Sequence, residues 1–263
     1  NATDVFVGPN TQTFADAVTN GNGGKLIFWA DRRMRFYGIV KGRGGKYFGD
    51  GGFVEVSGKE ELFFDGSVDT TAANGKTGTL LLDPDNIIIE SGSGTPTADS
   101  GAVTFTTYET TLEANSATSN VILLATSSIK FGADANDVVS LDLQGSGNSI
   151  TFTVTNGTIT YQNSNSSVTT QGGDINFSAK NGLAVGNLVS NDGDISLSGS
   201  SLSLLGNLNS GTGDIKVSHS DGGNIGLGSS STCGGTCSMT LTTTDLDKMT
   251  ANKLTIGNLT NGD

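Results

Sequence analysis

The charged residues between positions 31 and 61 are the part of this chain whose types and spacing could do chemistry. They are Asp31, Arg32, Arg33, Arg35, Glu55, Lys59, Glu60 and Glu61. Enzymes that cleave polysaccharides need several carboxylates, or carboxylates with a basic group, converging on one face. From position 131 onward the basic residues are scattered and do not cluster with acids: Lys180, Lys216, Lys248 and Lys253. We therefore expect solvated loop and outer-face charges and no catalysis, with a polysaccharide-degrading enzyme as the alternative.

Three aspartates recur at a constant interval, at Asp174, Asp194 and Asp214. Stacked carboxylates could share a calcium ion, which prefers oxygen ligands. Alternatively, each Asp side chain could cap its own turn by accepting backbone N–H groups beside a glycine. One carboxylate per repeat supplies too few calcium ligands, and the calcium-binding nonapeptide repeat is absent. We expect capping and no bound metal or cofactor.

Two cysteines, Cys233 and Cys237, enclose a Gly-Gly-Thr segment. The two glycines give the backbone the freedom to close a disulfide. A zinc site would need two further ligands, and His219 is the single histidine, so we expect a local disulfide rather than a free or metal-binding pair. A disulfide indicates an oxidising compartment such as the periplasm, the cell surface or the medium. A Ser-His-Asp site would depend on His219 alone, for which we expect a surface position.

Aromatic residues that could stack on sugars are scarce. Trp29, Tyr37 and Tyr47 are the candidates for carbohydrate binding, and for Trp29 we expect burial in a strand.

A strict short repeat sets the architecture that must position these groups. Gly173-Asp174-Ile175 returns as Gly193-Asp194-Ile195 and as Gly213-Asp214-Ile215. Short alternating apolar segments at a constant period of about 20 residues are typical of stacked solenoids, in which each repeat buries its apolar face against its neighbours. Two columns of stacked side chains are expected, one of Asn187 and Asn207 and one of Val185, Leu205 and Ile225.

A second and longer repeat precedes the first. Seven positions from Gly24 to Val40 match seven positions from Gly52 to Val68 without a gap. Each unit contains three short alternating segments, as in a three-sided right-handed parallel β-helix. The longer period, about 28 residues, predicts a longer loop at one corner, near residues 43–50.

The whole chain is expected to form one elongated, all-β parallel β-helix with about 20–28 residues per coil. Residues 23–90 form longer coils with loops, 165–230 form the regular shorter coils, and 231–263 form an end region with the cysteine pair. Only residues 11–18 invite a short helix.

The charge distribution is uneven. The net charge is −12, but residues 1–60 hold eight basic and six acidic side chains, so the remainder carries −14. An acidic rod repels nucleic acid and anionic membranes, and no segment is long and apolar enough to insert in a membrane. The opposite charges leave head-to-tail association into a homopolymer open. Because the chain starts at Asn1 without a Met or a signal peptide, we expect a processed or excised part of a longer protein.

The segment from Gly51 to Lys59, with residues 24–31, 65–69 and 78–84 around it, resembles the exoproteins of two-partner secretion systems. This family contains the filamentous-haemagglutinin-like and high-molecular-weight adhesins, and the Gly-Asp-Ile coils are similar to its haemagglutinin repeats. The Asn-Pro-Asn-Gly type signature of the secretion domain is not found, which places this chain in the repeat region. The resemblance implies a right-handed parallel β-helix and export through an outer-membrane secretion partner.

It also implies a secreted or cell-surface fibre that adheres to a receptor or glycan on a host or neighbouring cell. From the repeats and this resemblance together, the expected function is a structural and adhesive segment of an exported bacterial surface fibre. The alternative is a polysaccharide-binding or polysaccharide-degrading β-helix.

Overall fold

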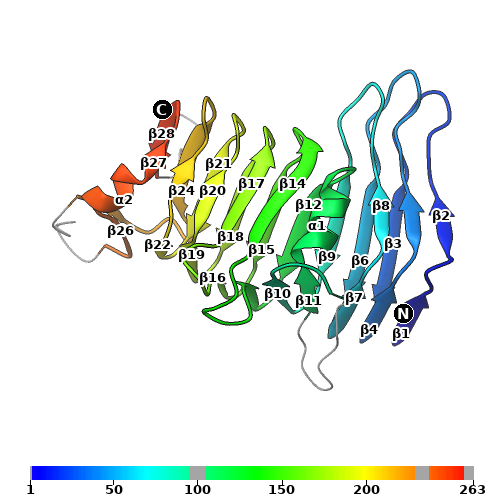
Figure 1. Cartoon of the computed structure of the whole chain (residues 1–263), viewed down its shortest axis with the longest axis horizontal. Helices are drawn as coiled ribbons and strands as arrows, with labels where there is room; N and C mark the ends of the chain where they lie inside the picture. The colour runs from blue at the N-terminus through cyan, green and yellow to red at the C-terminus, as the bar shows by residue number, and fades with distance from the viewer. Residues whose placement is uncertain (1, 95–104, 229–236, 258–263) are drawn as a thin grey trace.

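A computed structural model of the chain consists almost entirely of short parallel strands stacked along one long axis (Figure 1). The structure describes residues 2–94, 105–228 and 237–257. The fold is all-β and is a parallel β-helix, as the repeats predict. In the described part of the chain, neither helix has the length or apolar character needed to cross a bilayer.

One sheet of nine strands runs the length of the molecule and contributes one strand to each coil. Its members are β3 (Lys25–Ala30), β6 (Phe53–Gly58), β9 (Thr79–Asp83), β12 (Asn120–Ala125), β15 (Ile150–Val154), β18 (Ile175–Ala179), β21 (Ile195–Gly199), β24 (Asp214–His219) and β28 (Lys253–Ile256). Ile175, Ile195 and Ile215 are register partners in successive coils. With neighbouring strands about 4.8 Å apart, nine strands span roughly 40 Å.

Along the second side of the stack, the strands of the N-terminal coils form one sheet and those of the following coils form another. The first contains β1 (Asp4–Val7), β4 (Arg33–Phe36) and β7 (Glu61–Phe64). The second contains β11 (Phe105–Tyr108), β10 (Asn86–Glu90), β13 (Ser128–Phe131), β16 (Thr158–Tyr161), β19 (Gly182–Val185) and β22 (Leu202–Leu204), in that order.

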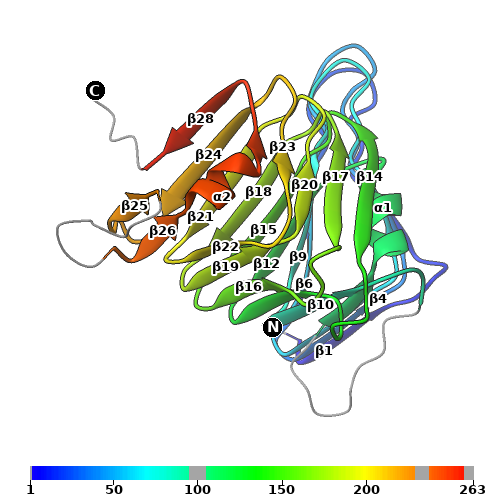
Figure 2. The same ribbon diagram turned by 60° about the vertical axis from the view of Figure 1, so that its left-hand side comes forward.

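The third side is also divided in two, and Figure 2 shows strands of the second part lying side by side. The first part contains β2 (Gln12–Phe14), β5 (Ile39–Lys41) and β8 (Ser67–Asp69), and the second contains β14 (Ser140–Ser146), β17 (Ser167–Gln171), β20 (Asn187–Val189), β23 (Leu208–Asn209) and β27 (Met249–Thr250). The three-sided plan of the coils is therefore confirmed.

The corner between the third strand of one coil and the first strand of the next explains the two repeat lengths. In the first three coils this corner is a long loop, formed by residues 15–24, 42–52 and 70–78. In the regular coils of the later repeat it shortens to residues 172–174, 190–194 and 210–213. The loop expected near residues 43–50 lies at this corner.

Alternating apolar residues point into the coils and form the core. Val54, Leu80, Val121, Ile150 and Ile175 are successive register partners, and each is at most 1% exposed. In the middle of the molecule, aromatic rings stack inside the coils. The ring centroids of Phe131 and Tyr161 are 4.1 Å apart, and those of Phe152 and Phe177 are 4.5 Å apart.

Helix α1 (Glu109–Ser116) replaces a strand between β8 and β14 on the third side of the stack. On one side, the Asn115 Oδ1 atom accepts the backbone N–H of Val68 in β8 at 2.9 Å. On the other, three side-chain oxygens of the helix accept backbone N–H groups of alternate residues in β14: Glu109 from Ser140, Glu113 from Asp142 and Ser116 from Gln144. The helix thus satisfies both strand edges that it separates.

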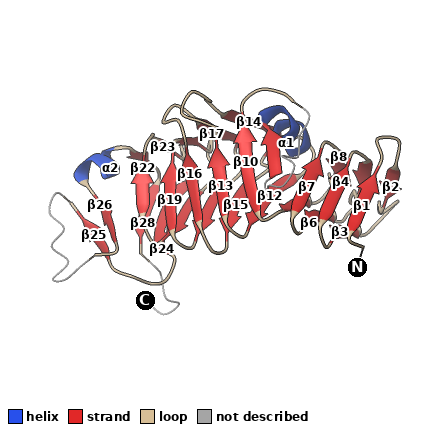
Figure 3. Cartoon of the chain, turned by 90° about the horizontal axis from the view of Figure 1, so that it is seen from below, coloured by secondary structure: helices blue, strands red, loops and turns tan. Residues whose placement is uncertain are grey.

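The chain order around α1 recurs near the C-terminal end. A long connection joins β10 to β11, which pairs back on β10, and α1 follows directly. In the same way β25 (Ile225–Leu227) pairs with β26 (Met239–Leu241), and α2 (Thr243–Asp247) follows. Figure 3 shows both helices on the same long side of the stack.

Two expectations about local structure are wrong. Residues 11–18 contain strand β2 and no helix. The column of Val185, Leu205 and Ile225 does not form, because Val185 pairs with Leu204 and Ile225 pairs with Met239. Leu205 lies in the turn after β22 and is 39% exposed.

Candidate functional site

The three long corner loops at the N-terminal end form the most prominent projection of the molecule (Figure 1). They stack on one another through backbone hydrogen bonds, such as that from Ala17 N–H to Arg43 O at 2.9 Å and that from Gly44 N–H to Thr71 O at 2.9 Å. The loops are therefore hydrogen-bonded from one coil to the next, as the strands are, although they do not have the regular strand conformation. We call residues 15–24, 42–52 and 70–78 the corner-loop crown.

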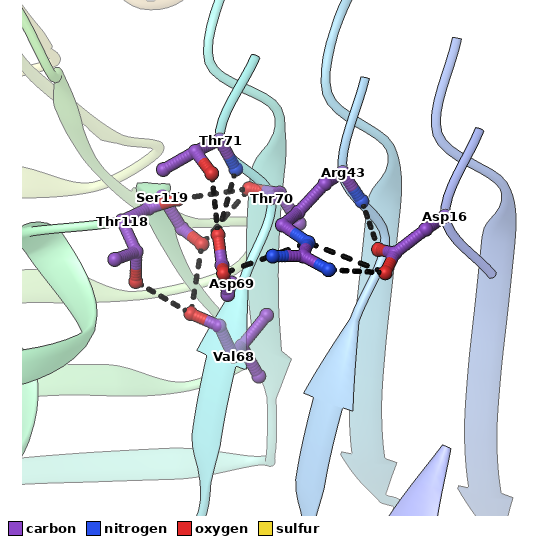
Figure 4. Close-up of polar contacts among 8 residues, drawn as sticks. All are labelled: Asp16, Arg43, Val68, Asp69, Thr70, Thr71, Thr118 and Ser119. Carbon is purple, nitrogen blue, oxygen red and sulfur yellow. Dashed lines mark hydrogen bonds and ion pairs between the residues drawn. The ribbon is translucent and has the colours of Figure 1, made fainter. Parts of the chain in front are cut away.

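Arg43 joins the three loops of the crown electrostatically (Figure 4). Its Nη2 atom lies 2.7 Å from Asp16 Oδ2, and its Nε atom lies 3.9 Å from Oδ2 of Asp69, the residue before the third loop. Hydrogen bonding to this guanidinium lowers the pKa of Asp16 and raises the pKa of Arg43 itself. Asp69 is held in turn by the Thr71 hydroxyl, which donates to Oδ1 at 2.7 Å. These contacts of Arg43 with two carboxylates fix the loops to one another.

A hollow of about 390 Å³ lies on the crown and is lined by Asp16, Ala17, Val18, Arg43, Gly44, Lys46, Thr71, Ala72 and Ala73. Large apolar side chains are exposed on the same loops, with Tyr47 63% and Phe48 60% exposed. The Lys46 ammonium lies 5.4 Å from the centre of the Tyr47 ring. The crown therefore combines basic and aromatic groups that are available for contact with another molecule.

A second hollow of about 340 Å³ follows the corner between the first and second strands of successive coils. It is lined by Trp29, Lys59, Glu60, Asp83, Pro84, Asp85 and Thr126. We call it the Trp29 groove. Contrary to expectation, Trp29 is not buried in its strand but is 38% exposed, and its Nε1–H donates to Asp31 Oδ1 at 3.2 Å.

The Asp83 carboxyl of this groove is partly buried and has a raised pKa. Burial, together with the neighbouring charges of Glu55 and Asp85, raises the pKa of Asp83 to about 6. Across the described residues, no protein donor hydrogen-bonds the Asp83 carboxyl, so nothing offsets the cost of its partial burial. The sequence Asp83-Pro84-Asp85 places two carboxylates beside one turn, but the burial of Asp83 is evident only from the fold.

Among the other charges between positions 31 and 61, Arg32 and Arg33 form ion pairs with acids of neighbouring coils. Arg33 is the register partner of Glu61 and forms a bidentate pair with it, and Arg32 Nη2 lies 2.6 Å from Asp4 Oδ2. Nowhere in the described residues do three or more His, Cys, Asp or Glu side chains come together in a way that could hold a metal ion.

The three repeated aspartates form a column, in which Asp174 and Asp194 each cap the next coil and not their own turn, while Asp214 accepts the side-chain N–H of Asn252 at 3.1 Å. Asp174 Oδ1 accepts the backbone N–H of Asp194 at 2.9 Å, and Asp194 Oδ1 accepts that of Asp214 at 2.8 Å. The same relay begins earlier, where Asn120 Oδ1 accepts the N–H of Ser149 at 2.8 Å and Ser149 Oγ accepts that of Asp174 at 3.0 Å. The glycine before each aspartate is required by close approach: a Cβ atom at Gly193 would lie 2.3 Å from the carbonyl oxygen of Gly173.

The predicted asparagine column is present at Asn187 and Asn207. Asn187 Oδ1 accepts the backbone N–H of Asn207 at 3.0 Å, so the amide caps the backbone of the next coil and does not contact the next amide. His219 is 6% exposed and not a surface residue, and its Nδ1 atom accepts the N–H groups of Asp221 and Gly223. Cys233 lies outside the described residues, so its disulfide with Cys237 stays a prediction.

Comparison of the chain with models of protein families, with curated proteins and with solved structures finds no match.

Proposed function

We propose that this chain is a non-catalytic structural and adhesive segment of an exported bacterial surface fibre. In this proposal an outer-membrane secretion partner exports the parent protein. The fibre then holds its contact surfaces away from the cell, where they meet a receptor or glycan of a host or neighbouring cell. Many weak contacts along one rigid body add to a strong attachment.

The observation that carries this proposal is that a continuous sheet supports loops that project from it and expose aromatic side chains. The nine-stranded sheet runs through every coil without interruption, while the crown projects from the first three coils and exposes Tyr47 and Phe48. A scaffold of this kind is typical of proteins that present binding residues on loops positioned by a rigid body. The resemblance of residues 24–84 to two-partner secretion adhesins points the same way.

A specific observation favours a second candidate, a polysaccharide-binding or polysaccharide-degrading β-helix. The Trp29 groove places an exposed indole beside a carboxyl with a raised pKa, and both groups are used by proteins that bind or cleave sugars.

Adhesion is tested by coating fluorescent beads with the purified chain and counting beads retained on intact epithelial and bacterial cells. Beads coated with serum albumin control for net negative charge and passive sticking. We expect retention well above the control and loss of much of it for the crown variant Tyr47→Ser/Phe48→Ser. Retention equal to the albumin control on every cell type contradicts the adhesive function.

The enzymatic alternative is tested separately, by incubating the chain with neutral and acidic polysaccharides with and without calcium and measuring new reducing ends or unsaturated products. We expect none, and cleavage that is lost in Asp83→Asn would favour the enzyme.

A further inference from the structure

The Trp29 groove runs along the stack and is built by residues from four successive coils: Trp29, Lys59, Asp83 with its neighbours, and Thr126. Trp29 and Asp83 are both register partners of Ser57, so they lie two rungs apart on the same outward side of the nine-stranded sheet. Two rungs correspond to about 10 Å. Ser57 lies on the rung between them and is fully buried, whereas the indole and the carboxyl both line the groove.

The side chains of the Trp29 groove offer two different kinds of contact to a hydroxylated ligand. A partly exposed indole offers a flat apolar face with a polar rim, and its orientation is fixed by the hydrogen bond to Asp31. The Asp83 carboxyl has oxygen acceptors that no protein donor in the described residues satisfies, and Asp85 lies beside it. An acceptor that is partly removed from water and has no partner favours any ligand that supplies hydroxyl donors.

Charge selects among hydroxylated ligands. The groove contains Glu60, Asp83 and Asp85 against the single cation Lys59, and Glu55 adds to the field at Asp83. A negative groove on a chain of net charge −12 repels uronic acids, sulfated glycans and phosphates. Its volume of about 340 Å³ falls in the range of roughly 300–1,000 Å³ found for small-molecule sites.

We propose that the Trp29 groove binds a neutral oligosaccharide lengthwise along the stack, with one pyranose ring on Trp29 and hydroxyls of a neighbouring sugar donating to Asp83 and Asp85. The inference rests on the proposed adhesive function, because it names the class of ligand that one surface of the adhesive segment takes. The crown, which has a net excess of basic side chains, is a different surface at another corner and has no part in it.

The chain offers an internal reporter for this site, because Trp29 is its single tryptophan. The probes are cellohexaose, mannohexaose and N-acetylchitohexaose, titrated into the full chain while tryptophan emission is recorded. We expect at least one of them to shift the emission to the blue and to saturate, and hexagalacturonate to produce no saturable change. No saturable change with any neutral hexaose, or an equal response to hexagalacturonate, overturns the proposal.

Variants then place the site by calorimetry with the best hexaose. Trp29→Ala is expected to weaken binding about tenfold, the scale of one stacked ring, and Trp29→Phe to restore much of the loss. Asp83→Leu is expected to weaken binding by a similar factor. The matched control is Tyr47→Ala, an exposed aromatic residue of the crown, which should leave hexaose affinity unchanged.

If Tyr47→Ala weakens hexaose binding as much as Trp29→Ala does, the sugar binds at the crown and the groove assignment is wrong. If beads adhere to cells but no hexaose binds, this inference fails while the adhesive function stands. If a hexaose binds saturably but beads do not adhere to cells, the groove is a glycan-binding site and the adhesive function is wrong.

Discussion

At the scale of single residues, the coils are locked together by side-chain oxygens that reach forward by one rung. Asn120, Ser149, Asp174 and Asp194 each accept a backbone N–H from the next coil. These bonds lie at the corner where each coil enters the nine-stranded sheet, just before strand pairing resumes. They therefore satisfy donors that the ladder itself does not reach.

Replacing Asp194 by Ala removes the acceptor for the N–H of Asp214. We expect a loss of about 1 kcal/mol in the free energy of unfolding, measured by urea denaturation. Asp194→Asn keeps an oxygen at the same place and should retain most of the stability. If the column instead held calcium, the two variants would be equally destabilised and calcium would raise the melting temperature of the parent chain, which would contradict the capping role.

The half-buried carboxyl of Asp83 makes stability depend on pH in a direction opposite to that of most surface acids. Its pKa is about 6 in the folded chain, against an ordinary value of 3.8. The folded state thus holds the proton more tightly, so the stability contributed by this group is complete below the ordinary pKa and is lost as the pH rises through the folded pKa. Asp83→Asn should raise the free energy of unfolding at pH 7.5 by about 1 kcal/mol, after discounting for the solvent exposure of the group.

The same substitution should change little at pH 3.5, where both side chains are neutral. Urea denaturation of the parent and the variant at pH 3.5, 5, 6 and 7.5 measures the difference. A gain that is independent of pH would mean that the carboxylate is not the cause.

At the scale of elements, α1 is the feature that departs most from the repeat. It stands where a strand would otherwise join β8 to β14, and its Asn115 is 4% exposed. The Asn115 amide satisfies the N–H of Val68 and also donates to the carbonyl oxygens of Gly66 and Thr111. One side chain therefore seals the edge of a strand against the helix.

Asn115→Ala should leave these buried groups without partners and lower the free energy of unfolding by roughly 2–3 kcal/mol. Thr110→Ala, at an exposed position on the same helix, is the matched control and should be neutral. Equal stability of the Asn115→Ala variant, measured by urea denaturation, would show that water or a neighbouring side chain replaces the amide.

The elements also show which features could be predicted from the sequence. Strict spacing predicts the strand columns wherever side chains alternate without interruption, as for Ile175, Ile195 and Ile215. The predicted column of Val185 and Leu205 does not form because the spacing between register partners changes. Partners are 20 residues apart in β18 and β21, 19 apart in β19 and β22, and 20 apart again in β20 and β23. Leu204 is thereby shifted into register, while Asn207 keeps its regular place above Asn187.

Helix α1 and the Trp29 groove could not be predicted for a different reason. The helical segment has two β-branched threonines and an N-cap without a side-chain cap, so local propensity gives no clear signal. The groove joins residues from separate coils, such as Trp29 and Thr126, and its existence depends on how the corners lie relative to one another.

At the scale of the whole molecule, each coil contacts only the coils next to it, so stability should be distributed along the axis by nearest neighbours. The aromatic stack of Phe131, Phe152, Tyr161 and Phe177 lies in the middle coils, whereas the crown belongs to the first three. A cavity in the stack should therefore loosen the middle of the rod and leave the N-terminal coils intact.

Phe152→Ala tests this, since the Phe152 side chain is fully buried and its loss should cost about 3–5 kcal/mol. Native-state hydrogen exchange should show faster exchange at the amides of β12, β15 and β18, with little change in β3 and β6. Phe152→Leu, which leaves a smaller cavity, should produce the same pattern with a smaller amplitude. A uniform increase across all coils would instead mean that the rod unfolds as one cooperative unit, in which case damage at any coil would release the crown as well.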